Sequence, residues 1–414
     1  MTRLVQLTTY PLRQPRHGGQ LRCAAIRSLY RQAGIEVETI ALLHGGDYHP
    51  SGHERNDIVL PADHAGYDPL LPRFTDSQGG RILAGDSATW RRFADLLDRF
   101  APDIIQLEQP WLYPGVRRWL QERAPAVRPR LVYSSQNIEW KLKRDEGPHG
   151  GAGAQAYLAE VARAEALERE LARSADLVVA CTAEEEAELR SMAGTGAPGR
   201  FVTAHNAIAP FTPDPARIEA LKERHGLDRY PLFIGSAHPP NVDGFWRMLA
   251  PSLAFLRPGE RIVVAGGVGH LLRQHRGYAG WSGINEPRLL LLGEVERADL
   301  DALLGGASVV LLPITTGGGS NLKTAEAIYS GRPVLATPHA LRGYGDAGRW
   351  PTIRVADDAD AFRRVLRSLL DATPEPLPAG YDAIRSQVTW DVALAPLVAA
   401  IGAWITPAPQ MPRH

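Results

Sequence analysis

The chain has only two cysteines among its 414 residues, Cys23 and Cys181, and they form no CxxC pair. So few thiols exclude a disulfide framework and indicate a reducing compartment. An excess of charge of one sign is also missing, because 46 Lys and Arg residues balance 46 Asp and Glu residues. A formal net charge of zero argues against a protein that binds nucleic acid by bulk electrostatics.

Long apolar segments are absent as well. Nothing approaches the run of about 18 apolar residues that spans a bilayer, and the first residues, Met1–Gln6, do not form a secretory signal. Metal-ligand spacing is missing too, since HExxH does not occur and His49 and His53 lie in an irregular stretch. We therefore expect a cytoplasmic globular protein without a bound metal, long enough for two α/β domains.

The chain does contain many short apolar runs separated by segments with helical spacing. Runs of this kind are typical of strands buried on both faces of a parallel sheet, so the alternation predicts α/β architecture. Three prolines in Ala209–Pro215 suit a linker between two domains. We expect domains at 1–208 and 209–385, followed by a helical segment and a frayed tail at 386–414.

The most informative stretch begins with the apolar run Ser308–Pro313 and continues into three glycines, Gly317–Gly319. A helix is expected to open near Ser320 or Asn321, and its free N–H groups and dipole favour an anion. Lys323 lies in the first turn, where a cation opposes the dipole unless an anion is bound there. Glu326 follows one turn later, and its carboxylate can accept hydrogen bonds from hydroxyl groups.

A second glycine-rich turn lies near the N-terminus, where Gly18 and Gly19 stand directly before an expected helix. Ligands of open α/β sheets bind outside the carboxyl ends of the strands, so these glycines are candidates for a second contact with a phosphate-bearing ligand. The alternative is that they only shape a turn.

The segment Gly318–Thr337 resembles the signature of GT-B glycosyltransferases of the retaining GT4-like class, also called group 1. The resemblance implies two facing Rossmann-like domains with parallel sheets and a C-terminal helix that crosses back to the N-terminal domain. It also implies a nucleoside-diphosphate-sugar donor in the C-terminal domain. Four further segments agree with this family: Gly235–Gly244, Leu289–Val295, Ser135–Trp140 and Thr389–Trp390.

The resemblance assigns roles by position. Glu326 matches the second acid of the family's E-x7-E motif, which binds the ribose hydroxyls, and Gln136 stands where the N-terminal domain usually has a histidine. Lys323, Glu326 and Gln136 are therefore the expected catalytic residues. The expected donor-binding residues are Gly18, Gly19, Ser236, Asn241, Gly293, Val295, Gly318, Gly319, Ser320, Asn321, Leu322, Lys323 and Glu326.

Two departures from the family pattern affect these roles. Gly318 occupies the position of the first acid of E-x7-E, and no Lys or Arg follows the first strand of the C-terminal domain between Gly235 and Gly244. We therefore expect Lys323 to pair with the diphosphate, with Arg247 and His238 as weaker candidates.

The expected activity is transfer of a sugar with retention at the anomeric carbon, without a cofactor. The acceptor is a glycan, a lipid-linked glycan or a small metabolite. Two alternatives stay open: a nucleotide-sugar epimerase of the same fold, and a binding module that has lost turnover. A NAD-dependent enzyme is disfavoured, because Leu272 replaces the third glycine after Gly267 and Gly269.

Two segments mix arginines with aromatic residues, Trp90–Phe93 and Val116–Trp119. They suggest peripheral contact with the inner face of a membrane. The competing interpretation is that the aromatic rings are packed and the arginines extend to solvent.

Overall fold

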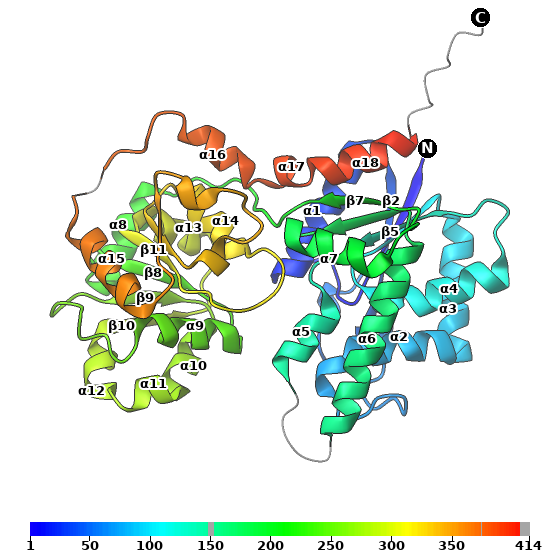
Figure 1. The fold of residues 1–414 in the computed structure, drawn as a ribbon, viewed down its shortest axis with the longest axis horizontal. Coiled ribbons are helices and arrows are strands. Elements are labelled where there is room, and N and C mark those ends of the chain that lie inside the picture. The colour runs from blue at the N-terminus through cyan, green and yellow to red at the C-terminus, as the bar shows by residue number, and fades with distance from the viewer. Residues whose placement is uncertain (148–152, 374, 406–414) are drawn as a thin grey trace, which may run out of the picture. The chain divides into compact units, whose positions relative to one another are not determined.

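The computed structural model describes residues 1–147, 153–373 and 375–405 of the chain (Figure 1). They form two compact units, of which the first comprises Met1–His205 with the chain from Leu394 onward and the second Asn206–Ala393. Each unit is a parallel sheet covered by helices, which confirms the predicted α/β class. The expected frayed tail falls on residues 406–414, which lie outside the described residues.

The first unit is built on a seven-stranded sheet with the order β3-β2-β1-β4-β5-β6-β7, and every neighbouring pair is parallel. The order reverses between β1 and β4, which is the switch point where Rossmann-like sheets open a crevice for ligands. The strands are β1 (Arg3–Thr8), β2 (Glu36–His44), β3 (Ile58–Leu60), β4 (Ile104–Leu107), β5 (Arg130–Ser134), β6 (Leu177–Ala180) and β7 (Arg200–Thr203).

Eight helices of the described residues belong to this unit, and the last of them comes from the C-terminal end of the chain. This helix, α18, packs beside β7, and its Trp404 lies under the Arg130 guanidinium. The predicted return of the C-terminal helix to the N-terminal domain is therefore present. The helices are α1 (Gly18–Gln32), α2 (Thr75–Gly85), α3 (Ser87–Phe100), α4 (Tyr113–Arg123), α5 (Glu139–Glu146), α6 (Ala154–Ser174), α7 (Ala183–Ala193) and α18 (Ala395–Ile405).

The second unit has a six-stranded parallel sheet with the order β10-β9-β8-β11-β12-β13, and its switch point lies between β8 and β11. Successive residues of a strand point to opposite faces, so a strand covered on both faces is apolar throughout. Leu232 of β8 accordingly enters one core and the next residue, Phe233, enters the other. The strands are β8 (Pro231–Ile234), β9 (Ile262–Ala265), β10 (Leu289–Gly293), β11 (Val309–Leu312), β12 (Val334–Ala336) and β13 (Ile353–Val355).

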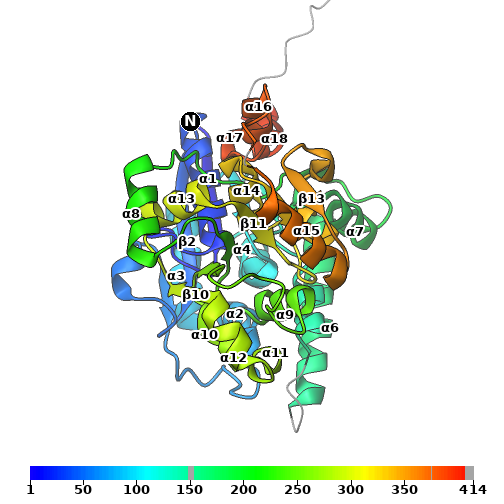
Figure 2. The same cartoon turned by 90° about the vertical axis from the view of Figure 1, so that its left-hand side faces the viewer.

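Helices cover both faces of this second sheet, with α8 and α13 on one side and α9 and α15 on the other (Figure 2). The helices α9 and α14 both begin at the carboxyl ends of the central strands. The helices of this unit are α8 (Pro215–His225), α9 (Pro239–Leu249), α10 (Val268–Gln274), α11 (Arg276–Ala279), α12 (Ser282–Asn285), α13 (Arg297–Gly306), α14 (Leu322–Ser330), α15 (Ala359–Asp371), α16 (Tyr381–Gln387) and α17 (Trp390–Ala393).

Candidate active site

The candidate site lies in the second unit, at the carboxyl ends of β8 and β11. The β8 strand leads through Gly235 into α9, and β11 leads through the glycine loop into α14. These two connections meet closely, because a Cβ atom on Gly244 of α9 would lie 2.1 Å from the carbonyl oxygen of Pro313. Two helix N-termini are thereby brought to the switch point of the sheet, where a bound anion finds free N–H donors.

The glycine loop is held in place by residues that follow β12. Gly317 has φ +114°, and Gly319 has φ +59°, so both occupy backbone conformations that side chains disfavour. The Arg342 guanidinium donates to the Gly318 carbonyl at 2.5 Å, and His339 Nε2 lies 3.1 Å from the Gly317 carbonyl. The carbonyls therefore point toward Arg342 and His339, which fixes the direction of the loop's peptide planes.

Lys323 lies in the first turn of α14 and is largely enclosed by protein. Its Nζ donates to Asn241 Oδ1 of α9 and lies 5.9 Å from the centroid of the Phe233 ring. Burial, reinforced by the positive charge of Arg342, lowers the pKa of Lys323 to about 8, and Glu326 acts in the opposite direction. Because burial disfavours the charged form of the amine, a bound anion beside Lys323 would stabilise that form.

Glu326 follows one turn later on α14 and is only 9% exposed. Its Oε1 accepts a hydrogen bond from Arg297 NH1 at 2.6 Å, and Arg297 NH2 also lies 2.7 Å from Asp301 Oδ1. Burial raises the pKa of Glu326, whereas the charge of Arg297 opposes that shift. Arg297 therefore favours the ionised form, which accepts hydrogen bonds from hydroxyl groups.

The turn between the glycine loop and α14 is held by hydrogen bonds from Asn206, the first residue of this unit, and from Tyr344. Asn206 donates through its backbone N to Ser320 Oγ at 2.7 Å and through Nδ2 to the Ser320 carbonyl at 2.6 Å. Tyr344 Oη donates to the Asn321 carbonyl at 2.6 Å. Ser320 is buried, so its side chain supports the turn, whereas Asn321 caps α14 and Leu322 opens it.

The other expected donor-binding residues of this unit form two groups, Ser236 with Asn241 after β8 and Gly293 with Val295 at the end of β10. Asn241 Nδ2 donates to the Ser236 carbonyl at 3.0 Å, which ties the β8 connection to α9 and leaves Asn241 Oδ1 for Lys323. Gly293 ends β10 with φ +68°, and Val295 packs against the core of this unit. Both residues lie at the carboxyl end of β10, the outer neighbour of β9 in the sheet, and so at the same edge as the glycine loop.

Of the two weaker candidates for a cation, Arg247 does not reach this edge. It lies in the last turn of α9, about 12 Å along the helix axis from the first turn at 1.5 Å per residue. Because α9 starts at the sheet edge and runs away from it, the position of Arg247 disfavours it as a diphosphate partner. His238 caps the start of the same helix and remains at the edge.

In the first unit, Gly18 and Gly19 form the first turn of α1 rather than the loop before it. A Cβ atom on Gly19 would lie 2.6 Å from both Gln136 Oε1 and Tyr10 Oη, so a larger residue here would displace these two side chains. Gln136 Nε2 donates to Tyr10 Oη and to Cys23 Sγ, the latter at 3.2 Å. Both amide hydrogens of Gln136 are thus directed into the protein, and its Oε1 faces Gly19.

The carboxyl edge of this first sheet also gathers carboxylates that the sequence did not reveal. Burial raises the pKa of Asp76 to about 6 and the pKa of Glu139 to about 7, although Lys143 lowers both. Behind them Glu168 is fully buried, accepts from Tyr133 Oη at 2.6 Å and receives the backbone N–H groups that open α5. Burial raises the pKa of Glu168 to about 8.

The two segments that suggested peripheral membrane contact, Trp90–Phe93 and Val116–Trp119, have their aromatic rings packed inside the first unit. Trp90, Phe93 and Trp119 are all buried. This favours the packing interpretation, in which the rings are not available for insertion into a bilayer. Within the described ranges no helix is long and apolar enough to cross a membrane, and no group of three His, Cys, Asp or Glu side chains is placed to hold a metal ion.

Several site residues escaped the sequence interpretation: Asn206, Arg297, His339 and Arg342. His339 and Arg342 follow β12, the neighbour of β11, so the rule that ligands bind at carboxyl ends of strands could have found them. Asn206 and Arg297 also follow strands, β7 and β10, but one sequence does not show that they pair with Ser320 and Glu326.

Comparisons with known proteins agree with this geometry. Residues 17–207 match the family model of the glycosyl transferase 4-like domain, and residues 228–372 match that of the glycosyl transferases group 1. A comparison with curated proteins found no match.

Solved structures with a similar fold span almost the whole chain. HepE from Anabaena in complex with UDP is 16% identical, with TM-score 0.64 over 97% of this chain and 100% of its own. Sucrose-phosphate synthase from Thermosynechococcus elongatus is 16% identical, with TM-score 0.67 over 98% and 99%. WaaG, a glycosyltransferase involved in lipopolysaccharide biosynthesis, is 18% identical, with TM-score 0.61 over 98% of this chain and 100% of its own.

At this identity the likeness to solved structures shows the shared fold, and the two family models add the activity class. The chain is a glycosyltransferase of the GT4-like, group 1 family with the GT-B fold.

Proposed function

We propose that this glycosyltransferase takes its sugar from a nucleoside-diphosphate-sugar held at the N-terminus of α14, and transfers it with retention at the anomeric carbon. The observation that carries the proposal is the placement of Lys323 and Glu326 one helical turn apart at the switch point of the second sheet. A cation and a carboxylate in that order match a diphosphate followed by a ribose. The neighbours HepE with UDP and with UDP-glucose make uridine diphosphate sugars the first donors to test.

Each group has one task in this proposal. Lys323 and the N–H groups that open α14 stabilise the negative charge that develops on the departing diphosphate. Glu326, kept ionised by Arg297, accepts hydrogen bonds from the ribose hydroxyls. With glycine at position 318, the N–H groups of the triple glycine bind the sugar in place of an acid.

The reaction breaks the bond between the anomeric carbon and the diphosphate oxygen. A new bond forms from the same face between that carbon and an acceptor hydroxyl oxygen, and the hydroxyl proton passes to the departing diphosphate. No step uses a metal or a cofactor.

The acceptor is assigned to the first unit, where Asp76 and Glu139 lie at the carboxyl edge of the sheet. Carboxyl groups form hydrogen bonds with sugar hydroxyls, and in their ionised form they repel phosphate groups. They therefore favour an uncharged glycan, free or lipid-linked, over a phosphorylated small acceptor. Gln136 supports the Gly19 turn through Tyr10, so we assign it a positioning role in place of the catalytic role expected from the sequence.

The proposal is tested by supplying UDP-, GDP-, dTDP- and ADP-sugars and following the products by ¹H NMR. We expect one donor to raise the melting temperature and to yield a product with the donor's anomeric configuration. An inverted product would contradict the retaining mechanism. Inversion at C2 of the donor would indicate an epimerase, and binding without turnover across the acceptor panel would indicate a binding module.

A further inference from the structure

The first unit has an arginine-lined groove that the glycosyltransferase reaction does not use. It has a volume of about 820 Å³ and lies between the segment before β3 and one side of α3. Its polar lining residues are Arg55, Asn56, Arg91, Arg92, Asp95 and Arg99.

The charge of this groove is strongly positive. Its four guanidinium groups are exposed, and within the described residues none of them forms an ion pair. Arg91 Nε donates to the Ser87 carbonyl at 2.9 Å and Arg92 NH2 donates to the Asp57 carbonyl at 2.8 Å, which leaves their other N–H groups available. The groove's one lining carboxylate, Asp95, lies 3.5 Å from Arg123 outside the groove.

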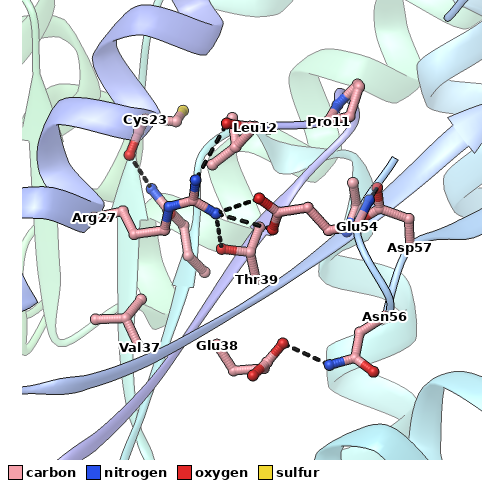
Figure 3. A network of polar contacts seen from close by, with 12 residues as sticks. Pro11, Leu12, Cys23, Arg27, Val37, Glu38, Thr39, Glu54, Asn56 and Asp57 are labelled. Atoms are coloured by element: carbon pink, nitrogen blue, oxygen red, sulfur yellow. Dashed lines mark hydrogen bonds and ion pairs between the residues drawn. The ribbon is translucent and has the colours of Figure 1, made fainter. Parts of the chain in front are cut away.

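The wall that carries Arg55 is held by polar contacts (Figure 3). Arg27 pairs with both carboxylate oxygens of Glu54, at 2.8 and 2.9 Å. Asp57 Oδ2 accepts from the Glu54 backbone N at 2.7 Å, and Asn56 Nδ2 donates to Glu38 at 2.5 Å. Because the residues on both sides of Arg55 are fixed, the wall is set before any ligand arrives, which lowers the entropic cost of binding.

The opposite wall is the polar side of α3. The apolar side of this helix is buried through Trp90, Phe93 and Leu97, so the helix cannot rotate. Arg91, Arg92 and Arg99 are therefore held toward the groove, and the apolar residues that line it beside them are the small Ala88 and the buried Leu96. Such a surface attracts anions but has no side chain that would anchor it in the hydrocarbon of a membrane.

We propose that this groove is a binding site for a soluble, phosphate-bearing small molecule with at least two phosphate groups. Guanidinium groups bind phosphate oxygens in pairs, and four of them around one recess exceed what a single phosphate needs. The groove lies beside the edge strand β3, whereas the nucleotide-sugar site belongs to the second unit. It is therefore a second anion site, separate from the donor site.

The test uses inorganic tripolyphosphate as the probe, with a saturating nucleoside diphosphate present to occupy the donor site. Hydrogen exchange should show protection of residues 54–57 and 87–100, and titration calorimetry should give one tripolyphosphate per chain. The double variant Arg91→Ala/Arg99→Ala should weaken binding about 100-fold, because each lost charge-assisted contact is worth about one factor of ten. The single variant Arg55→Gln should weaken it about tenfold.

The matched control is Arg169→Ala/Arg190→Ala, which removes two exposed arginines of α6 and α7 that pair within their own helices. It should leave the affinity unchanged, and circular dichroism should show all variants folded. Equal affinity in wild type and Arg91→Ala/Arg99→Ala would overturn the site. Binding to phosphatidylglycerol vesicles that depends on these arginines, without binding of tripolyphosphate, would overturn the soluble ligand in favour of a lipid headgroup.

Discussion

Replacement of Lys323 by methionine separates its charge from its packing. Methionine is uncharged and flexible enough to keep the contact with the Phe233 ring. If Lys323 stabilises the leaving diphosphate, its removal should lower kcat by about 10²–10³-fold, the loss typical for one preorganised group aimed at developing negative charge. This corresponds to about 3–4 kcal/mol of transition-state stabilisation.

The pH profile gives a second signature of the same residue. The pKa of Lys323 in the free protein is lowered to about 8, so the amine loses its charge as pH rises through that value. We expect kcat/KM to fall above about pH 8. A bound diphosphate favours the charged amine, so the same limb in kcat should lie at higher pH.

Initial rates of sugar transfer between pH 6 and 10 measure both effects. Lys222→Met is the control, since Lys222 is the one lysine of α8 in the same unit and forms an ion pair with Glu219 of its own helix. It should keep wild-type kinetics. Near-wild-type turnover in Lys323→Met, with the alkaline limb unchanged, would refute the assignment of Lys323 to the diphosphate.

The remaining predictions concern the ribose site, a packing contact and a buried acid. Arg297→Gln should weaken nucleoside diphosphate binding about tenfold in calorimetry while leaving 2′,3′-dideoxy analogues unaffected, because Glu326 loses the cation that keeps it ionised; an equal loss for both ligands would contradict this. Gly244→Ala should lower the free energy of unfolding in urea by about 1–3 kcal/mol, whereas Gly283→Ala, whose Cβ meets no atom within 4 Å, should not lower it. Glu168 has a raised pKa of about 8, so the folded protein binds more protons than the unfolded chain between about pH 4.5 and 8, and its contribution to stability falls as pH rises through that window. The pH slope of the melting temperature should flatten in Glu168→Gln, and an unchanged slope would contradict the assignment.

Most central strands of the two sheets were predictable because they are buried on both faces and therefore apolar along most of their length, whereas the edge strand β13 has exposed residues at Arg354 and Val355. Leu232 and Phe233 show the cause, since neighbours in one strand enter two different cores. The stretch from Leu43 to Asp86 is harder to predict from the sequence, because its apolar residues show little periodicity. It contains β3, only three residues long, and α2, whose periodicity is weakened by Gly79 and Gly80. Gly80 has a packing reason, because its Cβ would lie 1.9 Å from the Trp111 carbonyl oxygen.

The site was predictable where one continuous segment carried it. Lys323 and Glu326 follow the triple glycine in the sequence, so their shared helix could be inferred. Arg297 and Asn206 act on that helix from other elements, and one sequence gives no sign of such long-range pairs. Gln136 was assigned by its position in a motif, but its direction depends on Tyr10 and Cys23, which lie more than a hundred residues earlier.

A crystal structure of the protein with the nucleoside diphosphate that raises its melting temperature most would test the donor site directly. We expect the diphosphate within hydrogen-bond distance of Lys323 Nζ and the N–H groups that open α14, with the ribose hydroxyls on Glu326. A nucleotide bound elsewhere, or bound with Glu326 still paired to Arg297 and making no contact with the ribose, would contradict it.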